Sequence, residues 1–154
     1  MKIFAISDLH IDYSENMNWL INLSHFDYSN DILILAGDIS DLLAHIKNAF
    51  AILSKLFKRV HFVPGNHDLW VMRNKTKTSI EQFEQLKIIL TEYNISMEPC
   101  VYDGVTIVPL FGWYDYSFGA PHVDLEYSWM DYKACVWPEE LLGSNKESNI
   151  TQYF

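Results

Sequence analysis

The first hundred residues show short apolar runs separated by stretches in which apolar residues recur every three or four positions. The runs predict three β-strands, at residues 2–6, 32–36 and 60–63. The run at 32–36 contains only apolar residues, which is typical of a central parallel strand covered on both faces. The sequence also predicts three amphipathic helices, and these cover about residues 14–23, 42–57 and 79–93.

Side chains that can cap a helix stand at the start of each periodic stretch. The candidate N-caps are Ser14 for the first helix, Ser40 or Asp41 for the second, and Thr78 or Ser79 for the third. Glu81 or Gln82 follows three residues after the last two, which is the pattern of a capping box. For Asp41, capping and a role in chemistry are both open.

Beyond residue 94 the pattern changes to short strands and then to aromatic residues. Strands are predicted at 95–97, 101–102 and 105–110, with Asp103-Gly104 as a hairpin turn. The chain then becomes irregular and rich in Trp and Tyr. Residues 143–149 are polar and show no core pattern.

The order of these elements fixes the expected fold class. Three strand–helix–strand steps predict a parallel sheet with right-handed crossovers, followed by a more antiparallel half. A chain of 154 residues can bury one hydrophobic core, and it contains no internal repeat, linker or low-complexity segment. We therefore expect one α/β domain over residues 1–154.

Each of the three predicted strands ends in a polar cluster. Asp8 and His10 follow the first strand, Asp38 follows the second, and Asn66 and His67 follow the third. Carboxylate, imidazole and amide oxygen are side chains that hold divalent metals of the Mn, Fe or Zn kind. In an open α/β sheet, ligands bind in the crevice beyond the carboxyl ends of the strands. The three clusters therefore predict a metal site at that edge.

The charge and cysteine content restrict the partners and the compartment. The chain has 11 Lys and Arg against 20 Asp and Glu, a formal net charge of −9, which argues against nucleic acid held by electrostatics. A phosphorylated substrate remains compatible, because bound metal ions reverse the sign of the local field. With two cysteines, no signal-peptide pattern and no membrane-spanning stretch, we expect free thiols, no membrane partner and a cytoplasmic location.

Taken in order, the motifs Asp8-x-His10, Gly37-Asp38-x-x-Asp41 and Gly65-Asn66-His67-Asp68 resemble those of the calcineurin-like metallophosphoesterases. The spacing and the position of the motifs at strand ends both match. The resemblance implies a β-sandwich of two sheets flanked by helices. It also implies two divalent metal ions and hydrolysis of a phosphomonoester or phosphodiester.

The same resemblance implies a role for each motif residue. The implied metal ligands are Asp8, His10, Asp38 and Asn66. Asp38 would bridge the two metals, and a hydroxide shared between them would attack the phosphorus. His67 would protonate the leaving group, and Asp41 would hydrogen-bond His67 and set its tautomer.

The chain departs from the family pattern after His67. The family supplies three later histidines, whereas this chain has only His122, in a segment that matches none of the family motifs. The second metal would then have too few ligands. We therefore expect the fold to be incomplete at its C-terminus. We also expect the chain alone to bind Mn²⁺ weakly and to hydrolyse a generic aryl phosphate slowly or not at all. The alternative function is an inactive or truncated binding or scaffold module of this fold.

Some polar and aromatic residues have simpler interpretations. Asp68 is expected to close the turn after His67, without a catalytic role. The basic residues Arg73, Lys75 and Lys77 are expected to form a solvated loop. Three aromatic residues after the last strand favour core packing over a substrate-binding lip: Trp113, Tyr114 and Tyr116.

Overall fold

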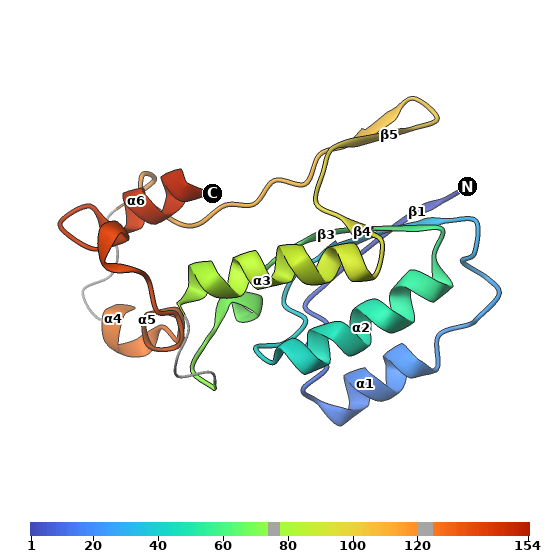
Figure 1. The fold of residues 1–154 in the computed structure, drawn as a ribbon, viewed down its shortest axis with the longest axis horizontal. Helices are drawn as coiled ribbons and strands as arrows, with labels where there is room; N and C mark the ends of the chain where they lie inside the picture. Colours follow the sequence, from blue (N-terminus) through green and yellow to red (C-terminus); the bar gives the residue numbers. More distant parts are fainter. Residues whose placement is uncertain (74–77, 120–124) are drawn as a thin grey trace.

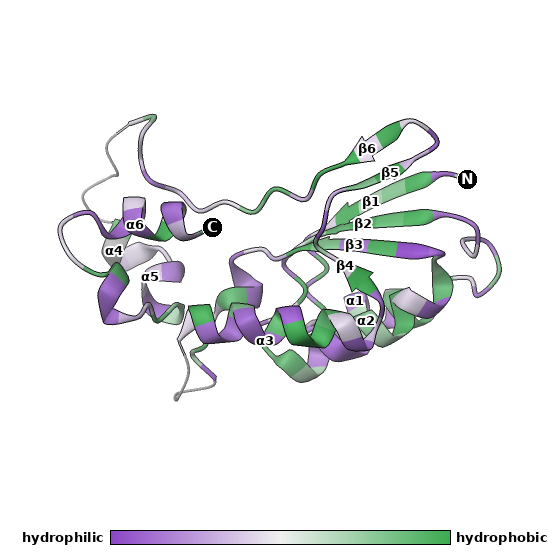
Figure 2. Ribbon diagram, turned by 45° about the horizontal axis from the view of Figure 1, so that its top comes forward, coloured by the Kyte–Doolittle hydropathy of each residue, from purple (hydrophilic) through white to green (hydrophobic). Residues whose placement is uncertain are grey.

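A computed structural model of the chain describes residues 1–73, 78–119 and 125–154. Its main sheet is parallel, with strand order β1-β2-β3-β4 (Figures 1 and 2). The strands are β1 (Ile3–Ser7), β2 (Ile32–Ala36), β3 (Arg59–Val63) and β4 (Ile95–Ser96). This confirms the predicted strands and their parallel arrangement.

Three helices cover one face of this sheet (Figure 2). They are α1 (Ser14–Ile21), α2 (Leu43–Leu56) and α3 (Ser79–Glu92). The apolar stripe of α2 is buried from Ile46 to Leu56 and packs with Leu35 and Phe62 of the sheet in one hydrophobic core. Burial of these stripes, and not helix propensity alone, holds the helices in place.

The predicted helix caps were only partly correct. Thr78 and Glu81 form the capping box of α3, as predicted. Ser14 is the first residue inside α1 and gives no side-chain cap, so that prediction was wrong. The α2 prediction was also wrong, because Leu42 is the N-cap there and the Ser40 hydroxyl accepts from the Leu42 N–H just before the helix.

The second sheet is a hairpin on the other face of the main sheet (Figure 2). Its strands β5 (Cys100–Tyr102) and β6 (Val105–Ile107) are antiparallel. Asp103 and Gly104 form the predicted turn, with φ angles of 48° and 83° that suit a type I′ hairpin. The hydroxyl of Tyr102 lies 2.8 Å from the His61 Nε2 on β3 and so joins the two sheets. The structure thus has the two sheets and flanking helices expected for the fold.

The C-terminal part packs as short helices beside the end of α3 (Figure 1). They are α4 (Leu125–Ser128), α5 (Asp131–Ala134), η2 (Glu139–Leu141) and α6 (Lys146–Tyr153). The sequence pattern did not indicate α6, which anchors itself with few apolar residues, chiefly the buried Ile150. Backbone hydrogen bonds from Val71 to Ala134 and from Ser79 to Val136 tie this segment to the loop after β3 and to the start of α3.

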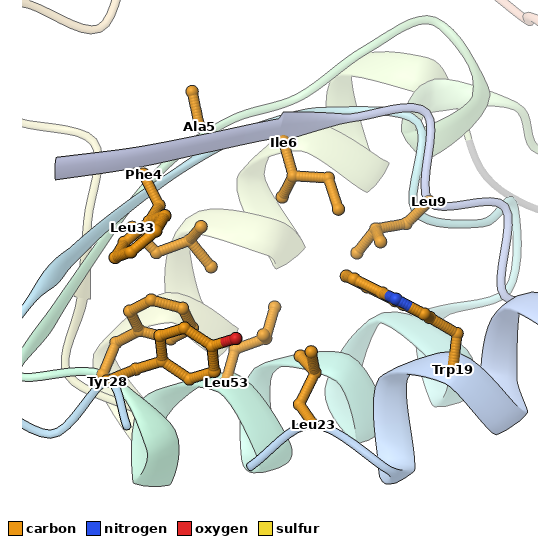
Figure 3. Close-up of a pocket in the computed structure, with 10 residues that line it drawn as sticks. Phe4, Ala5, Ile6, Leu9, Trp19, Leu23, Tyr28, Leu33 and Leu53 are labelled. Atoms are coloured by element: carbon orange, nitrogen blue, oxygen red, sulfur yellow. The ribbon is translucent and has the colours of Figure 1, made fainter. Parts of the chain in front are cut away.

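An apolar pocket of about 170 Å³ lies between the sheet and α1 and α2 (Figure 3). Trp19 of α1 points into it from one side, and Phe4 and Tyr28 close the other (Figure 3). Its lining carries no candidate metal ligand, so it belongs to the core and not to the site. Within the described ranges no helix combines the length and apolar character that crossing a membrane requires.

Candidate metal centre

The site lies where the carboxyl ends of β1, β2 and β3 meet. The parallel register places Ser7, Ala36 and Val63 side by side as the last paired residues of the three strands. The loops that follow stay in contact, because the Asp8 N–H donates to the Gly37 carbonyl and the His10 N–H donates to the Asp38 carbonyl. The three polar clusters are therefore brought to one edge, as the strand pattern predicted.

Three of these side chains converge closely. One ligand atom each of His10, Asp38 and His67 lies within 4.8 Å of the other two. The two imidazole rings are 4.6 Å apart between centroids, and an Asp38 carboxylate oxygen accepts from the His67 backbone N–H at 3.0 Å. The His10 imidazole nitrogen and an Asp38 carboxylate oxygen suit a divalent first-row metal, so these two predicted ligands fit the group that the resemblance implies. His67, the predicted acid, lies against both of them.

The other two predicted ligands border this group. Asp8 Oδ1 lies 3.9 Å from His10 Nε2, and its side chain is 67% exposed. The Asn66 side-chain nitrogen donates to Asp131 at 2.7 Å, which leaves its oxygen available as a ligand. The structure therefore gathers His10, Asp38 and His67 most tightly, with Asp8 and Asn66 beside them.

The backbone that carries the ligands is conformationally unusual. Asp8, His10 and Asp38 have φ angles of 55°, 40° and 55°, in a left-handed region that residues other than glycine rarely adopt. Such conformations tend to occur at functional sites, where the surrounding structure holds them. Here they lie directly after β1 and β2, where the chain turns out of the sheet.

Two glycines allow the strand ends to approach one another. A Cβ added to Gly37 would fall closer than 3.0 Å to the backbone of Gly65, and Gly37 itself has φ +70°. A Cβ on Gly65 would overlap the Asp38 carboxylate. Only glycine lets these two loops pack against each other at this distance.

Asp68 holds the same two loops together from behind. It lies in η1 (His67–Leu69), is fully buried, and accepts hydrogen bonds from the backbone N–H groups of Asp38, Ile39, Ser40 and Gly65 at 2.8–3.3 Å. Burial raises the pKa of the Asp68 carboxyl to about 7, and the backbone N–H groups lower it in part. The expected turn-closing role thus extends to the loop after β2 as well.

Asp41 pairs with a basic residue in this structure. Its carboxylate lies 3.0 Å from Arg73 Nε, and burial raises the Asp41 pKa while Arg73 lowers it. No hydrogen bond from Asp41 to His67 is present among the described residues. Arg73 is half-exposed and also lies near Asp12, so it is not simply a solvated loop residue. The other residues interpreted from the sequence in these segments, Lys75, Lys77 and His122, lie outside the described residues.

His67 is held by an aromatic neighbour. Its imidazole stacks on the Trp70 indole with 3.6 Å between ring centroids. Burial lowers the His67 pKa, Asp38 raises it, and His10 lowers it further. The net effect favours the neutral imidazole.

Sequence reasoning missed Asp131. This residue is 3% exposed and lies between Asn66, Trp70 and Trp129, although more than sixty positions separate it from Asn66. The one signal in the sequence is an acidic residue within an aromatic segment, Trp129-Met130-Asp131-Tyr132. A buried carboxylate there requires donors, and indole N–H groups are nearby candidates.

A cavity of about 230 Å³ lies beside Asn66 and Asp131. Aromatic side chains form much of its wall, among them Phe111, Trp113, Tyr114 and Trp129. Trp113 also packs edge-on against Trp137 in the core, at 5.0 Å between centroids. Trp113 therefore combines the two roles that the sequence left open, packing in the core and lining the site.

Comparisons with known proteins agree with this geometry. Residues 1–143 match the profile of the calcineurin-like phosphoesterase family. The chain is 30% identical over 125 residues to the [acyl-carrier-protein] phosphodiesterase PptH of Mycobacterium tuberculosis, covering 75% of this chain and 38% of that protein. It is 32% identical over 94 residues to a symmetrical bis(5'-nucleosyl)-tetraphosphatase of Buchnera aphidicola, covering 56% of this chain and 34% of that protein.

A solved structure supports the fold as well. The crystal structure of the phosphopantetheinyl hydrolase PptH from Mycobacterium tuberculosis superposes with a TM-score of 0.63 at 29% identity. The match covers 94% of this chain and 55% of that chain, so the sequence spans about half of the solved relative and less of the curated ones. With the family profile matched over nearly its whole length, the chain belongs to the calcineurin-like phosphoesterase family.

Proposed function

We propose that this chain carries the metal-binding strand ends of a phosphoesterase that hydrolyses a phosphomonoester or phosphodiester. The observation that carries this proposal is the convergence of His10, Asp38 and His67 within 4.8 Å at the carboxyl edge of the sheet. Divalent metals at such a site polarise phosphate oxygens and lower the pKa of bound water. Mn, Fe and Zn all suit this mixture of nitrogen and oxygen donors.

Each side chain then has a defined task. Asp8, His10 and Asp38 would hold one divalent metal ion, and Asp38 and the Asn66 amide oxygen would hold a second. The His67 imidazole lies within 4.8 Å of the ligand atoms of His10 and Asp38, and from there it would protonate the leaving-group oxygen. Burial lowers the pKa of His67, while the carboxylates of Asp38, Asp131 and Asp41 oppose this effect and so favour the protonated form that an acid requires.

The substrate class is inferred from the chemistry of the site and its relatives. One relative is named as a phosphodiesterase and another as a tetraphosphatase, which supports a phosphorylated substrate. The cavity beside Asn66 offers room for the group attached to the phosphate. The acidic chain would otherwise repel a phosphate, so bound metals have to supply the positive charge.

The test compares Asp38→Asn with Asp27→Asn, a change of the same kind at an exposed position outside the site. Mn²⁺ binding is measured by calorimetry, and hydrolysis is measured with an aryl phosphomonoester and a bis-aryl phosphodiester. Asp38→Asn should weaken Mn²⁺ binding and lower kcat/KM at least about 100-fold, whereas Asp27→Asn should change neither. Full activity in Asp38→Asn would contradict the proposal. Mn²⁺ binding without turnover in the unsubstituted protein would favour the binding-module alternative.

A further inference from the structure

Asp131 is a buried carboxylate whose two oxygens are both occupied by side-chain N–H groups. Its Oδ1 accepts from the Asn66 side-chain nitrogen and from Trp70 Nε1, each at 2.7 Å. Its Oδ2 accepts from Trp129 Nε1 at 3.0 Å. A carboxylate that is 3% exposed needs such donors to offset the loss of hydration.

The bond to Asn66 determines which end of its amide faces the metal centre. An ionised carboxylate only accepts hydrogen bonds, so the Asn66 NH₂ group, and not its oxygen, must face Asp131. The amide oxygen is then turned away from Asp131. Because only this oxygen of the amide can ligate a divalent metal, a reversed amide would offer the metal no lone pair.

The same carboxylate oxygen also acts on His67 through Trp70. The indole of Trp70 is fixed at its Nε1 by Asp131, and its ring stacks on the His67 imidazole at an angle of 29°. Asp131 Oδ1 therefore contacts both Asn66, a proposed ligand, and Trp70, which packs against the proposed acid His67.

Resting on the function proposed above, we propose that Asp131 is a positioning residue of the metal centre. It orients the Asn66 amide so that the oxygen is presented to the metal, and it holds Trp70 against His67. In this proposal Asp131 is not a metal ligand and acts through Asn66 and Trp70. Outer partners of this kind typically change metal affinity by about 10- to 100-fold when they are replaced.

The first test measures Mn²⁺ affinity by calorimetry in Asp131→Asn and in Asp115→Asn. Asp115 is an exposed acid of the same aromatic segment and serves as the matched control. Asp131→Asn should weaken Mn²⁺ binding by about 10- to 100-fold, and Asp115→Asn should leave it unchanged. Equal affinity in Asp131→Asn and the unsubstituted protein would overturn this inference alone. Absence of Mn²⁺ binding in the unsubstituted protein would overturn the proposed function itself.

A double-mutant cycle separates positioning from a general structural effect. If Asp131 acts on affinity through Asn66, Asp131→Asn should cause no further loss of Mn²⁺ affinity when Asn66 is already alanine. Losses that multiply fully in the double variant would contradict this route. Thermal unfolding of every variant shows whether the fold is retained.

A measurement on the unsubstituted protein decides the matter if Asp131→Asn fails to fold. With Zn²⁺ bound, the Asn66 side-chain NH₂ should give a slowly exchanging NMR signal, because its proton is held by Asp131. Rapid exchange of that NH₂ with water would show that Asp131 does not hold the amide, and would overturn the inference.

Discussion

Gly65→Ala tests whether the position of the Asp38 carboxylate controls metal binding. An alanine Cβ at this position would lie 2.8 Å from both Asp38 Cγ and the Asp38 backbone nitrogen, and nearer still to Oδ1, so the backbone of Asp38 would have to shift together with its carboxylate. Ordinary contact begins at about 3.4 Å, so the Asp38 carboxylate would have to move by about 0.6 Å or more. Metal sites tolerate displacements of only about 0.2 Å in ligand distance. We therefore expect Mn²⁺ affinity to fall by about 10- to 100-fold.

The measurement is calorimetric titration with Mn²⁺, accompanied by urea unfolding to show that the variant is folded. Gly119→Ala is the matched control, because an added Cβ there would meet nothing within 4 Å. Gly119→Ala should retain the affinity of the unsubstituted protein. If Gly65→Ala is folded and binds Mn²⁺ equally well, Asp38 either adjusts freely or does not bind the metal, and the reasoning fails.

Two further predictions concern stability. Thr78→Ala removes the capping box of α3 and should lower the free energy of unfolding by about 1 kcal/mol in urea titrations. Ser14→Ala removes no cap and should change the free energy of unfolding by less than about 0.5 kcal/mol. Burial lowers the pKa of His61 below its ordinary value of 6.5. Below pH 6.5 the imidazole is therefore protonated in the unfolded chain but not in the folded chain. The free energy of unfolding should fall as the pH is lowered from 6.5 towards the pKa of His61 in the folded chain. His61→Gln should remove this contribution, at most about 1.4 kcal/mol per pH unit, and identical pH profiles for the two proteins would contradict it.

Much of the fold could be predicted because its signals are local. The run at 32–36 is apolar, and that at 60–63 is apolar except for His61, since both faces of these strands are covered. The stripe of α2 repeats with the helical period since one face is buried. The caps were harder, because a Ser or Asp before a helix can bond elsewhere. The Ser40 hydroxyl, for example, lies 3.0 Å from an Asp12 carboxylate oxygen and does not cap α2.

The candidate site was predictable only in part, because some of its contacts depend on the paths of irregular segments. The convergence of His10, Asp38 and His67 follows from parallel strands that end at one edge. The ion pair between Asp41 and Arg73 depends on the path of the loop after β3, which no periodic pattern reports. The bond from Asn66 to Asp131 depends on how the C-terminal segment returns to the sheet, and aromatic residues at irregular spacing do not determine that path.

Asp68 and Asp131 show why a list of metal donors describes such a site incompletely. Neither is a proposed ligand, yet Asp68 accepts four backbone N–H groups from the loops after β2 and β3, and Asp131 accepts three side-chain N–H groups around Asn66. A buried donor without an acceptor costs about 1–3 kcal/mol, so these loops are most stable in the arrangement that satisfies both acids. The same arrangement fixes the loop that carries Asp38 and the side-chain amide of Asn66. The proposed ligands Asp38 and Asn66 are thus held by hydrogen bonds that need no metal, which is the physical basis for expecting preorganisation in this centre.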